Sequence, residues 1–503
     1  MSDPAAANTV PFSPSEIRAI VSGLMLIVLL GALDQTIVSV SLPQMASDLG
    51  GTSTLAWVVA GYLVASTVAT PVYGKLGDLY GRRLLLSVAV VIFLVASVAC
   101  AMAQSMPMLI AARILQGIGG GGLISTAQAI VGEVVPLRER GRYQGYISVV
   151  YAMASVGGPV LGGYLTHLLS WRWIFWINLP LGLIAIWIAR RVLKRLPVPG
   201  VRLPIDYLGA LLLTTGLSLL LVAITRMGQG VALISFQTLG MFFVAAILLV
   251  CFVRHEHRAV EPLIPPEIFK IRTVWIGCAI LFISFFQVVS LSTLVPFGMQ
   301  MLDGLGADQA ALQLIAFSLA IPIGAFASGR WMMHSGRYKP LQVIGTALLP
   351  SASIALAILG PHPTLATGCA LSVAGFATGM TLPTSLVAVQ NAVAQKNIGI
   401  ATAMTGLFRS MGGAIGVALL SAILFASMGT GAIGNASAIE LGLQAIPASA
   451  PATAERAFRL TFFCGAAIAS LAHVLAWMIP EASLRTAAQK TDITVLPKKT
   501  TES

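Results

Sequence analysis

Two ionisable side chains lie inside long apolar stretches of this sequence. Asp34 is the only carboxylate that we find well within such a stretch, and Arg113 lies within another. A charge is costly in the apolar interior of a membrane, so an ionisable residue there is a candidate for proton transfer or substrate binding. Both residues lie at a similar depth, roughly 10 Å from the outer ends of their helices at about 1.5 Å per helical residue. We expect Asp34, with the adjacent Gln35 and with Arg113, to carry proton coupling or substrate contact; a fixed structural ion pair is the alternative.

A third charge, Arg409, lies in the middle of the apolar stretch 398–426. Its side chain is expected to face a cavity or another helix rather than lipid, and direct contact with a substrate is one interpretation. The five cysteines are scattered without C-x-x-C spacing, so they do not indicate a metal or redox site. His255-Glu256-His257 lies beside a helix end in a charged loop, where a solvated segment is the better interpretation than a metal site. We predict no catalytic residue and no metal.

Membrane-spanning helices must hold these side chains. Hydrophobic residues make up 57% of the 503 residues and charged residues 10%, and the mean hydropathy is +0.89. Soluble domains are far more polar, and a helix needs about 20 apolar residues to cross a bilayer. We predict an all-α polytopic membrane protein with fourteen such helices, at residues 17–41, 54–73, 84–104, 107–131, 143–166, 173–190, 207–225, 232–253, 275–299, 310–332, 341–360, 364–391, 398–426 and 459–479.

The basic residues indicate how these helices are oriented. Most of the 30 Lys and Arg residues fall in the segments on one side of the predicted membrane. Cytoplasmic loops carry such an excess of positive charge, so we expect both termini in the cytoplasm and the protein in the cell membrane. The sequence pI of about 9.8 therefore reflects these loops, and no nucleic-acid partner is predicted. Residues 427–457 form the one sizeable loop expected on the outside.

The short segment between the second and third helices combines glycines with charges. It reads Gly74-Lys75-Leu76-Gly77-Asp78-Leu79-Tyr80-Gly81-Arg82-Arg83. Glycine permits the backbone angles of a tight turn, and Asp78 is placed to pair with neighbouring arginines or to meet the positive end of the next helix. A charge cluster here could hold one face of the protein closed and break in another state; solvated positive loops are the alternative. The expected members of this cluster are Gly74, Asp78, Gly81, Arg82, Arg83, Glu133, Arg138, Arg140 and Arg142.

The fifth helix contains a proline among glycines, in Gly158-Pro159-Val160-Leu161-Gly162-Gly163. Small residues allow membrane helices to approach closely, and proline removes a helical hydrogen bond and permits a bend. We expect a close-packed seam, which a hinge role would use and which dense packing alone would also explain.

One sequence offset suggests an internal repeat. It aligns Gly74 with Gly329, and it also aligns Arg82 with Arg337. Transporter folds are commonly built from such repeats. The predicted organisation is a cytoplasmic tail, a six-helix half, a linker with two extra helices, a second six-helix half and a second tail. The corresponding ranges are 1–16, 17–191, 192–274, 275–479 and 480–503.

Several of these segments together resemble the major facilitator superfamily of transporters. The loop from Gly74 to Arg83 resembles its signature loop, Arg113-Ile114-Leu115-Gln116-Gly117 its R-x-x-Q-G motif, and the segment from Gly158 to Gly163 its antiporter motif. Asp34-Gln35-Thr36-Ile37-Val38 with Leu42-Pro43 resembles the first-helix motif of the fourteen-helix drug:proton antiporters. Ala154 departs from the longer fifth-helix pattern, which usually has glycine there.

The resemblance implies a secondary transporter that exports amphipathic drugs or toxic compounds, cationic ones among them, in exchange for protons. The proton gradient would supply the energy, and no cofactor is implied. The partners would be a small-molecule substrate, protons and the lipid bilayer; an adaptor protein outside the membrane is not identified by the sequence. An exporter of a lipid or metabolite, or a proton-independent facilitator, could use the same fold. A membrane enzyme would need clustered His, Asp or Glu inside the spans, where Asp34 is the one carboxylate found.

Overall fold

The computed structural model describes residues 13–51, 54–196, 205–228, 235–428 and 451–483, and this described part is helical without any strand. Fourteen of its helical segments are long and apolar enough to cross a membrane, which confirms the predicted number of spans and the all-α class. The spans of the first half are α1 (Pro14–Leu49), α2 (Ala56–Tyr80), α3 (Arg82–Ala101), α4 (Met106–Val134), α5 (Leu137–Leu168) and the pair α6 (Trp173–Trp176) and α7 (Asn178–Val192), which together form the sixth span.

The remaining spans follow in chain order. They are α8 (Tyr207–Gly228), α9 (Phe236–Glu256), α11 (Arg272–Asp303), α13 (Leu314–Ser335), α14 (Lys339–Leu359), α15 (Leu365–Ala392), α16 (Ile398–Ser427) and α18 (Pro451–Met478). Shorter helical segments connect them: η2 (Leu193–Arg195), α10 (Pro266–Lys270), α12 (Ala307–Leu312) and η3 (Gln395–Asn397).

Helix ends depart from the predicted ranges where local signals extend a helix. α1 begins with a capping box between Ser13 and Glu16, in which each side chain bonds the other residue's backbone N–H, and such a box starts a helix efficiently. α18 begins at Pro451, so the described end of the stretch 427–457, predicted as a loop, is helical. Residues 429–450 of that stretch lie outside the described residues.

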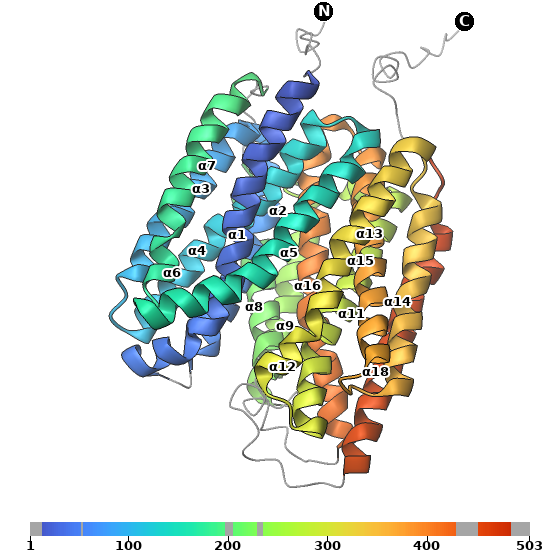
Figure 1. Cartoon of the computed structure of the whole chain (residues 1–503). Helices are drawn as coiled ribbons and strands as arrows, with labels where there is room; N and C mark the ends of the chain where they lie inside the picture. Colours follow the sequence, from blue (N-terminus) through green and yellow to red (C-terminus); the bar gives the residue numbers. More distant parts are fainter. Residues whose placement is uncertain (1–12, 52–53, 197–204, 229–234, 429–450, 484–503) are drawn as a thin grey trace, which may run out of the picture.

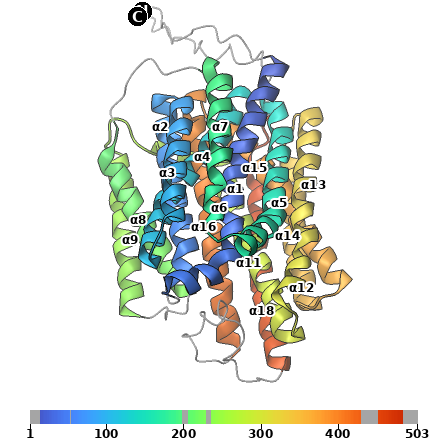
Figure 2. The same cartoon turned by 60° about the vertical axis from the view of Figure 1, so that its left-hand side comes forward.

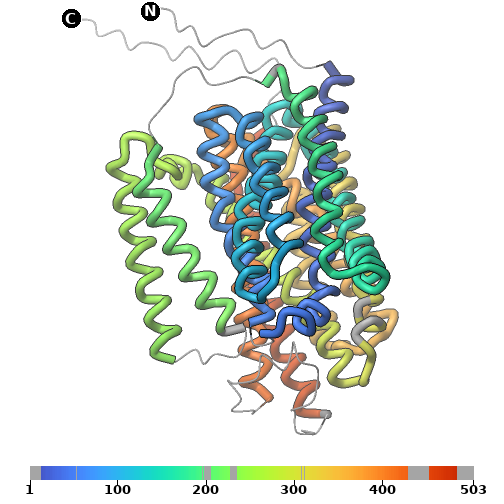
Figure 3. Tube along the Cα trace, turned by 90° about the vertical axis from the view of Figure 1, so that its left-hand side faces the viewer, coloured from blue at the N-terminus to red at the C-terminus, as the bar shows by residue number. Residues whose placement is uncertain are grey.

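The helices form two six-span halves that lie side by side (Figure 1). In the N-terminal half, α1 packs on α5 and α2 on α4; in the C-terminal half, α11 packs on α16 and α13 on α15. The two extra helices, α8 and α9, pack on each other, and α8 also contacts α2 and α16, one helix from each half. Figures 2 and 3 show this hairpin at the edge of the molecule. It therefore covers the seam between the halves on one side.

Glycines allow the helices within each half to pack backbone against backbone. A Cβ atom on Gly117 of α4 would collide with the carbonyl oxygen of Tyr62 in α2, and one on Gly375 of α15 would collide with that of Phe317 in α13. The hydrophobic effect contributes little to the association of helices in lipid, so van der Waals contact at such close backbone approach is a main source of their attraction. The two halves use the same device at corresponding pairs of helices.

The two halves meet closely at one face of the molecule. Because the number of spans is even, the beginning of α1 and the end of α18 lie on the same side, which we call the terminal face (Figure 1). There the backbones of Gly141 in α5 and Gly329 in α13 touch. A Cβ atom on Gly74 of α2 would lie 3.0 Å from the carbonyl oxygen of Gly399 at the start of α16. The structure is therefore closed at the terminal face.

Candidate functional site

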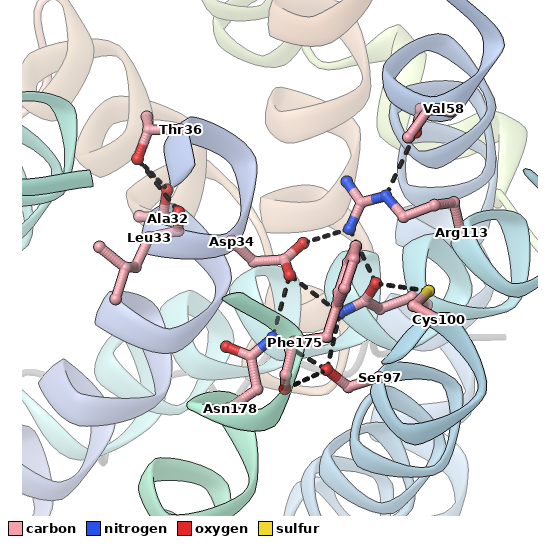
Figure 4. A network of polar contacts seen from close by, with 11 residues as sticks. Ala32, Leu33, Asp34, Thr36, Val58, Ser97, Cys100, Arg113, Phe175 and Asn178 are labelled. Atoms are coloured by element: carbon pink, nitrogen blue, oxygen red, sulfur yellow. Dashed lines mark hydrogen bonds and ion pairs between the residues drawn. The ribbon is translucent and has the colours of Figure 1, made fainter. Parts of the chain in front are cut away.

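Asp34 forms the centre of a polar network inside the N-terminal half (Figure 4). Its Oδ2 atom lies 2.7 Å from Nη1 of Arg113. Its Oδ1 atom accepts hydrogen bonds from Nε2 of Gln116 at 2.9 Å and from Nδ2 of Asn178 at 3.1 Å. The exposed fractions of Asp34 and Arg113 are 0% and 1%. The structure therefore brings together the two buried charges that the sequence indicated, and adds two amides to them.

Five helices hold this network in place, and each contributes a different contact. Arg113 also donates from Nε to the carbonyl oxygen of Val58 in α2 at 3.2 Å, and its guanidinium carbon lies 4.2 Å from the ring centroid of Tyr62. Ser97 of α3 accepts from Nδ2 of Asn178 in α7 at 3.0 Å. A buried ion pair is tolerated only when such additional bonds satisfy its atoms. The amides were missed as site residues in the sequence, although an Asn or Gln in an apolar stretch is itself a signal.

A large cavity lies beside this network and between the two halves. It has a volume of about 800 Å³ and is lined by residues of both halves and of α8. It extends to Ala56, the first residue of α2, on the side away from the terminal face. Asp34 and Arg113 do not line it, but Gln35 does, together with Arg409 of the opposite half. Of the four predicted coupling or substrate residues, two therefore face the cavity and two lie sealed next to it.

The cavity wall is mostly apolar, with hydroxyl and amide groups distributed over it. Phe285 and Leu63 are among its apolar members, and Gln128, Tyr151 and Thr402 are among its polar ones. Pockets of this kind, apolar with a few placed polar groups, suit amphipathic small molecules.

Packing of α5 against α1 connects the buried network to the cavity. A Cβ atom on Gly158 would collide with the hydroxyl of Thr36, and one on Gly162 would lie 2.6 Å from the carbonyl oxygen of Ile37. Thr36 also donates from its hydroxyl to the carbonyl oxygen of Ala154 at 2.8 Å. Of the remaining motif residues, Pro159 lies within α5, and a Cβ atom on Gly163 would meet only Val40, at 3.8 Å. Helix α5 therefore contacts α1 at the residues that directly follow Asp34 and Gln35.

Asp78 connects the two halves at the terminal face. Its carboxylate accepts hydrogen bonds from the backbone N–H groups of Gly399 at 3.1 Å and Ile400 at 2.9 Å, at the start of α16. A helix N-terminus carries partial positive charge and free N–H donors, so it binds a carboxylate well. Arg82 lies 2.8 Å from Asp78 and 2.9 Å from Glu133, so the three form a chain of ion pairs. The positive helix end that Asp78 meets belongs to the opposite half rather than to the next helix in the chain.

Two arginines of the predicted cluster lie elsewhere. Arg83 donates to the carbonyl oxygen of Arg190 at 3.4 Å, and Arg142 donates to the hydroxyl of Tyr146 at 3.0 Å; both of these bonds are exposed. The bond of Arg83 runs to α7 of its own half and that of Arg142 stays within α5, so neither of these bonds joins the two halves. Gly81, at φ 90°, forms the turn between α2 and α3.

Arg140 forms a second contact between the halves, which runs toward the cavity. Its Nη1 atom donates to Oε1 of Gln390 in α15 at 3.0 Å. Gln390 in turn donates from Nε2 to the hydroxyl of Thr402, which lines the cavity, at 2.9 Å. A hydrogen-bond chain therefore leads from the terminal face to the cavity wall.

His255 and Glu256, predicted to lie in a charged loop, are the last two residues of α9 and hold the chain that precedes and follows the α8–α9 pair. His255 lies 2.8 Å from Asp206, and Glu256 accepts from the backbone N–H groups of Leu263 and Ile264. Among the described residues, no group of three His, Cys, Asp or Glu side chains is arranged to hold a metal ion.

Comparisons with known proteins agree with this architecture. The family model described as the Major Facilitator Superfamily matches residues 24–417. An uncharacterised MFS-type transporter of Mycobacterium tuberculosis strain H37Rv is 34% identical over 96% of this chain and 74% of that protein. The multidrug transporter protein MdtP of Bacillus subtilis is 33% identical over 82% of this chain and 76% of that protein. The proton:xylose symporter XylE is similar in fold, with a TM-score of 0.63 at 16% identity over 94% of this chain and 98% of that one.

Proposed function

The chain belongs to the major facilitator superfamily, whose members are transporters rather than enzymes, and on that premise we propose that it exports amphipathic small molecules in exchange for protons. Relatives at about 30% identity are named multidrug transporters, which supports a broad range of small-molecule cargo. The excess of basic residues in the segments of the terminal face supports a location in the cell membrane with both termini in the cytoplasm.

The closed terminal face and the cavity on its other side correspond to one end state of alternating access. The bonds from Asp78 to the start of α16 and from Arg140 to Gln390 hold the halves together. The cavity extends toward the opposite face. In this proposal, breaking these bonds opens the cavity to the cytoplasm, where the cargo enters, and re-forming them returns it to the outside for release.

The observation that carries proton coupling is the buried carboxylate of Asp34, bonded by Arg113 and two amides one residue from the cavity-lining Gln35. A proton on Asp34 would remove half of the ion pair and turn one of its oxygens into a donor. Oδ1 of Asn178 has no hydrogen-bond partner among the described residues, and rotation of that amide would present it to the new donor. Protonation would thereby rearrange the network and, through α1, the neighbouring cavity wall.

Replacement of the carboxylate tests the proposal. Asp34→Asn should reduce transport driven by a pH gradient by roughly 5- to 150-fold, the range of a typical coupling free energy, because the amide cannot take up and release the proton. The measurement is movement of fluorescent amphipathic dyes of positive, zero and negative charge into proteoliposomes, with and without a pH gradient.

Asp48→Asn is the matched control, because Asp48 lies near the C-terminal end of the same helix with 42% of its side chain exposed, and the amide oxygen of asparagine can still accept the bond from Nε1 of Trp171. It should transport at the wild-type rate. A proton-independent facilitator is the second candidate, favoured by the fact that the Asp34 oxygens are already bonded in this state. Dye movement that is equal with and without the gradient, in the wild type and in Asp34→Asn, would establish the facilitator instead.

A further inference from the structure

The chemistry of the cavity wall gives information about the cargo. Arg409 lies on α16 in the middle of the span and lines the cavity with its side chain partly exposed. Its guanidinium carbon lies 5.3 Å from the ring centroid of Phe285, on α11. Tyr151 of α5 is close enough to interact electrostatically with it. No ion pair of Arg409 with a carboxylate is found within the described part of the chain.

Two of the buried arginines, Arg113 and Arg82, differ from Arg409 in this respect. Arg113 is paired with Asp34, and Arg82 with Asp78 and Glu133. The third, Arg140, forms no ion pair with a carboxylate among the described residues, but its guanidinium bonds protein oxygens, those of Val135 and Gln390. An unpaired charge at this depth of a membrane is costly. On a cavity wall, such a charge can be solvated by water while the cavity is empty. It can pair with the opposite charge of a ligand when the cavity is occupied.

Among the described residues that line the cavity there is no Asp or Glu, and Arg409 is their one charged side chain. The carboxylate nearest in sequence to the wall, Asp34, is fully buried and bonded to Arg113. A cationic cargo would therefore meet a positive charge and no negative one. An anionic cargo would meet a guanidinium, which binds a carboxylate, sulfonate or phosphate with two parallel hydrogen bonds.

From this arrangement we propose that the cargo is an amphipathic organic anion whose acidic group binds Arg409 and whose apolar body lies against Phe285 and the surrounding apolar wall. The proposal rests on the proposed function as an exporter and names its cargo class. It replaces the cationic drugs that the resemblance in sequence implied. Hydroxyl groups such as that of Ser410, next to Arg409 on the cavity wall, can complete the bonds of the anionic group.

Equilibrium binding of matched ligands tests this proposal without any need for proton coupling. The full-length protein is placed in lipid nanodiscs and titrated with radiolabelled pyrenebutyrate, its trimethylammonium analogue and the neutral alcohol, which share one apolar body; binding to empty nanodiscs is subtracted. The wild type should bind the anion at least about tenfold more tightly than the cation, which corresponds to about 1.4 kcal/mol. Arg409→Gln should abolish this preference and leave the affinity for the alcohol unchanged.

Two further variants separate charge from structure. Arg409→Lys keeps the positive charge and should retain a preference for the anion, although a weaker one, because lysine lacks the two-pronged geometry. Arg330→Gln removes an exposed arginine from the part of α13 near the terminal face. It should leave the affinities for all three ligands unchanged.

The proposal is overturned if the wild type binds the cation as tightly as the anion, or if the anion preference survives in Arg409→Gln. These outcomes are independent of proton coupling. Asp34→Asn could lose coupled transport and still prefer the anion, and an uncoupled facilitator would show the same preference.

Discussion

At the scale of single residues, the buried pair of Asp34 and Arg113 is the most constrained feature of the protein. The carboxylate has three hydrogen-bond donors, from α4 and α7, and the guanidinium also bonds the backbone of α2. Such a pair is a weak source of net stability compared with apolar packing, but removal of one partner leaves a buried charge without compensation. In the proposed mechanism, the pair matters because protonation of Asp34 switches the network between two hydrogen-bonding arrangements.

The cost of breaking this pair can be measured with a double-mutant cycle. Arg113→Gln should destabilise the protein by roughly 3–5 kcal/mol, because the Asp34 carboxylate remains buried without its cation. Asp34→Asn combined with Arg113→Gln should recover most of that loss, because no charge is left in the network. Thermal unfolding in detergent measures both.

Arg142→Gln is the control for this cycle, since Arg142 is an exposed arginine that bonds only within its own helix. It should unfold like the wild type. If the double variant were as unstable as the single one, the loss would come from packing rather than from the unpaired charge.

At the scale of helices, the proposed mechanism requires the contact between α5 and α1 to transmit changes between the polar network and the cavity. Gly158 and Gly162 let α5 approach Thr36 and Ile37, which follow Asp34 and Gln35 on α1. A close glycine contact of this kind permits sliding and tilting without side chains that interlock. The extra pair α8 and α9 has a different part, since Leu221 and Thr225 of α8 line the cavity at the seam between the halves.

Two glycines of α5, Gly157 and Gly162, offer a matched test of this contact. Gly162→Ala should lower both thermal stability and transport, because its Cβ atom would lie 2.6 Å from the carbonyl oxygen of Ile37, and the backbones must separate by several tenths of an ångström to relieve the overlap. Gly157→Ala should have little effect, because no atom lies within 4 Å of a Cβ atom there. Equal effects of the two substitutions, in unfolding and dye-transport measurements, would show that helix propensity rather than this contact decides the outcome.

At the scale of the whole molecule, the distribution of contacts between the halves sets the conformational state. The contacts of Asp78 and Arg140 across the halves gather at the terminal face, and the cavity occupies the space beyond them. The segment from Gly74 to Arg83, predicted as a loop, is helical apart from the turn at Gly81. This segment and its counterpart at Gly329 are not equivalent. The first binds the opposite half through Asp78, whereas Arg337 of the second pairs with Glu481 within its own half.

Asp78→Asn should shift the equilibrium toward opening of the terminal face. The neutral amide is a weaker acceptor for the N–H groups of Gly399 and Ile400 and no longer pairs with Arg82, so a loss of roughly 1–3 kcal/mol would change the population ratio by about 5- to 150-fold. Distances between spin labels on the terminal ends of α2 and α16 would report the shift. Transport should slow, with little change in cargo affinity.

Glu481→Gln is the control, because it removes an exposed ion pair inside one half, and exposed pairs contribute about 0–1 kcal/mol. Its label distances should match those of the wild type. A loss of cargo affinity in Asp78→Asn without a change in label distances would contradict the role of Asp78 in state selection.

The sequence by itself determined the number of spans, the sided distribution of basic residues and the identity of the buried charges. Hydropathy and charge act locally: a helix must offer enough apolar residues to the bilayer wherever it lies, so Asp34, Arg113 and Arg409 stand out without knowledge of any contact. The glycine turn at Gly81 is equally local and lies within the segment where the turn was expected. The capping box that starts α1 is local too, but it was not among the predictions, which began this helix at residue 17.

Only the tertiary structure decided which of these residues meet. In the structure, Gln35 lines the cavity and the adjacent Asp34 is buried. Asp78 bonds the start of α16, more than three hundred residues away in the chain, and Arg83 and Arg142 take no part in that contact. The structure also places Arg409 on a cavity wall without a carboxylate. The physical reason is that these relations depend on the rotation of each helix and on backbone approach at glycines in distant segments, neither of which the local pattern of one segment specifies.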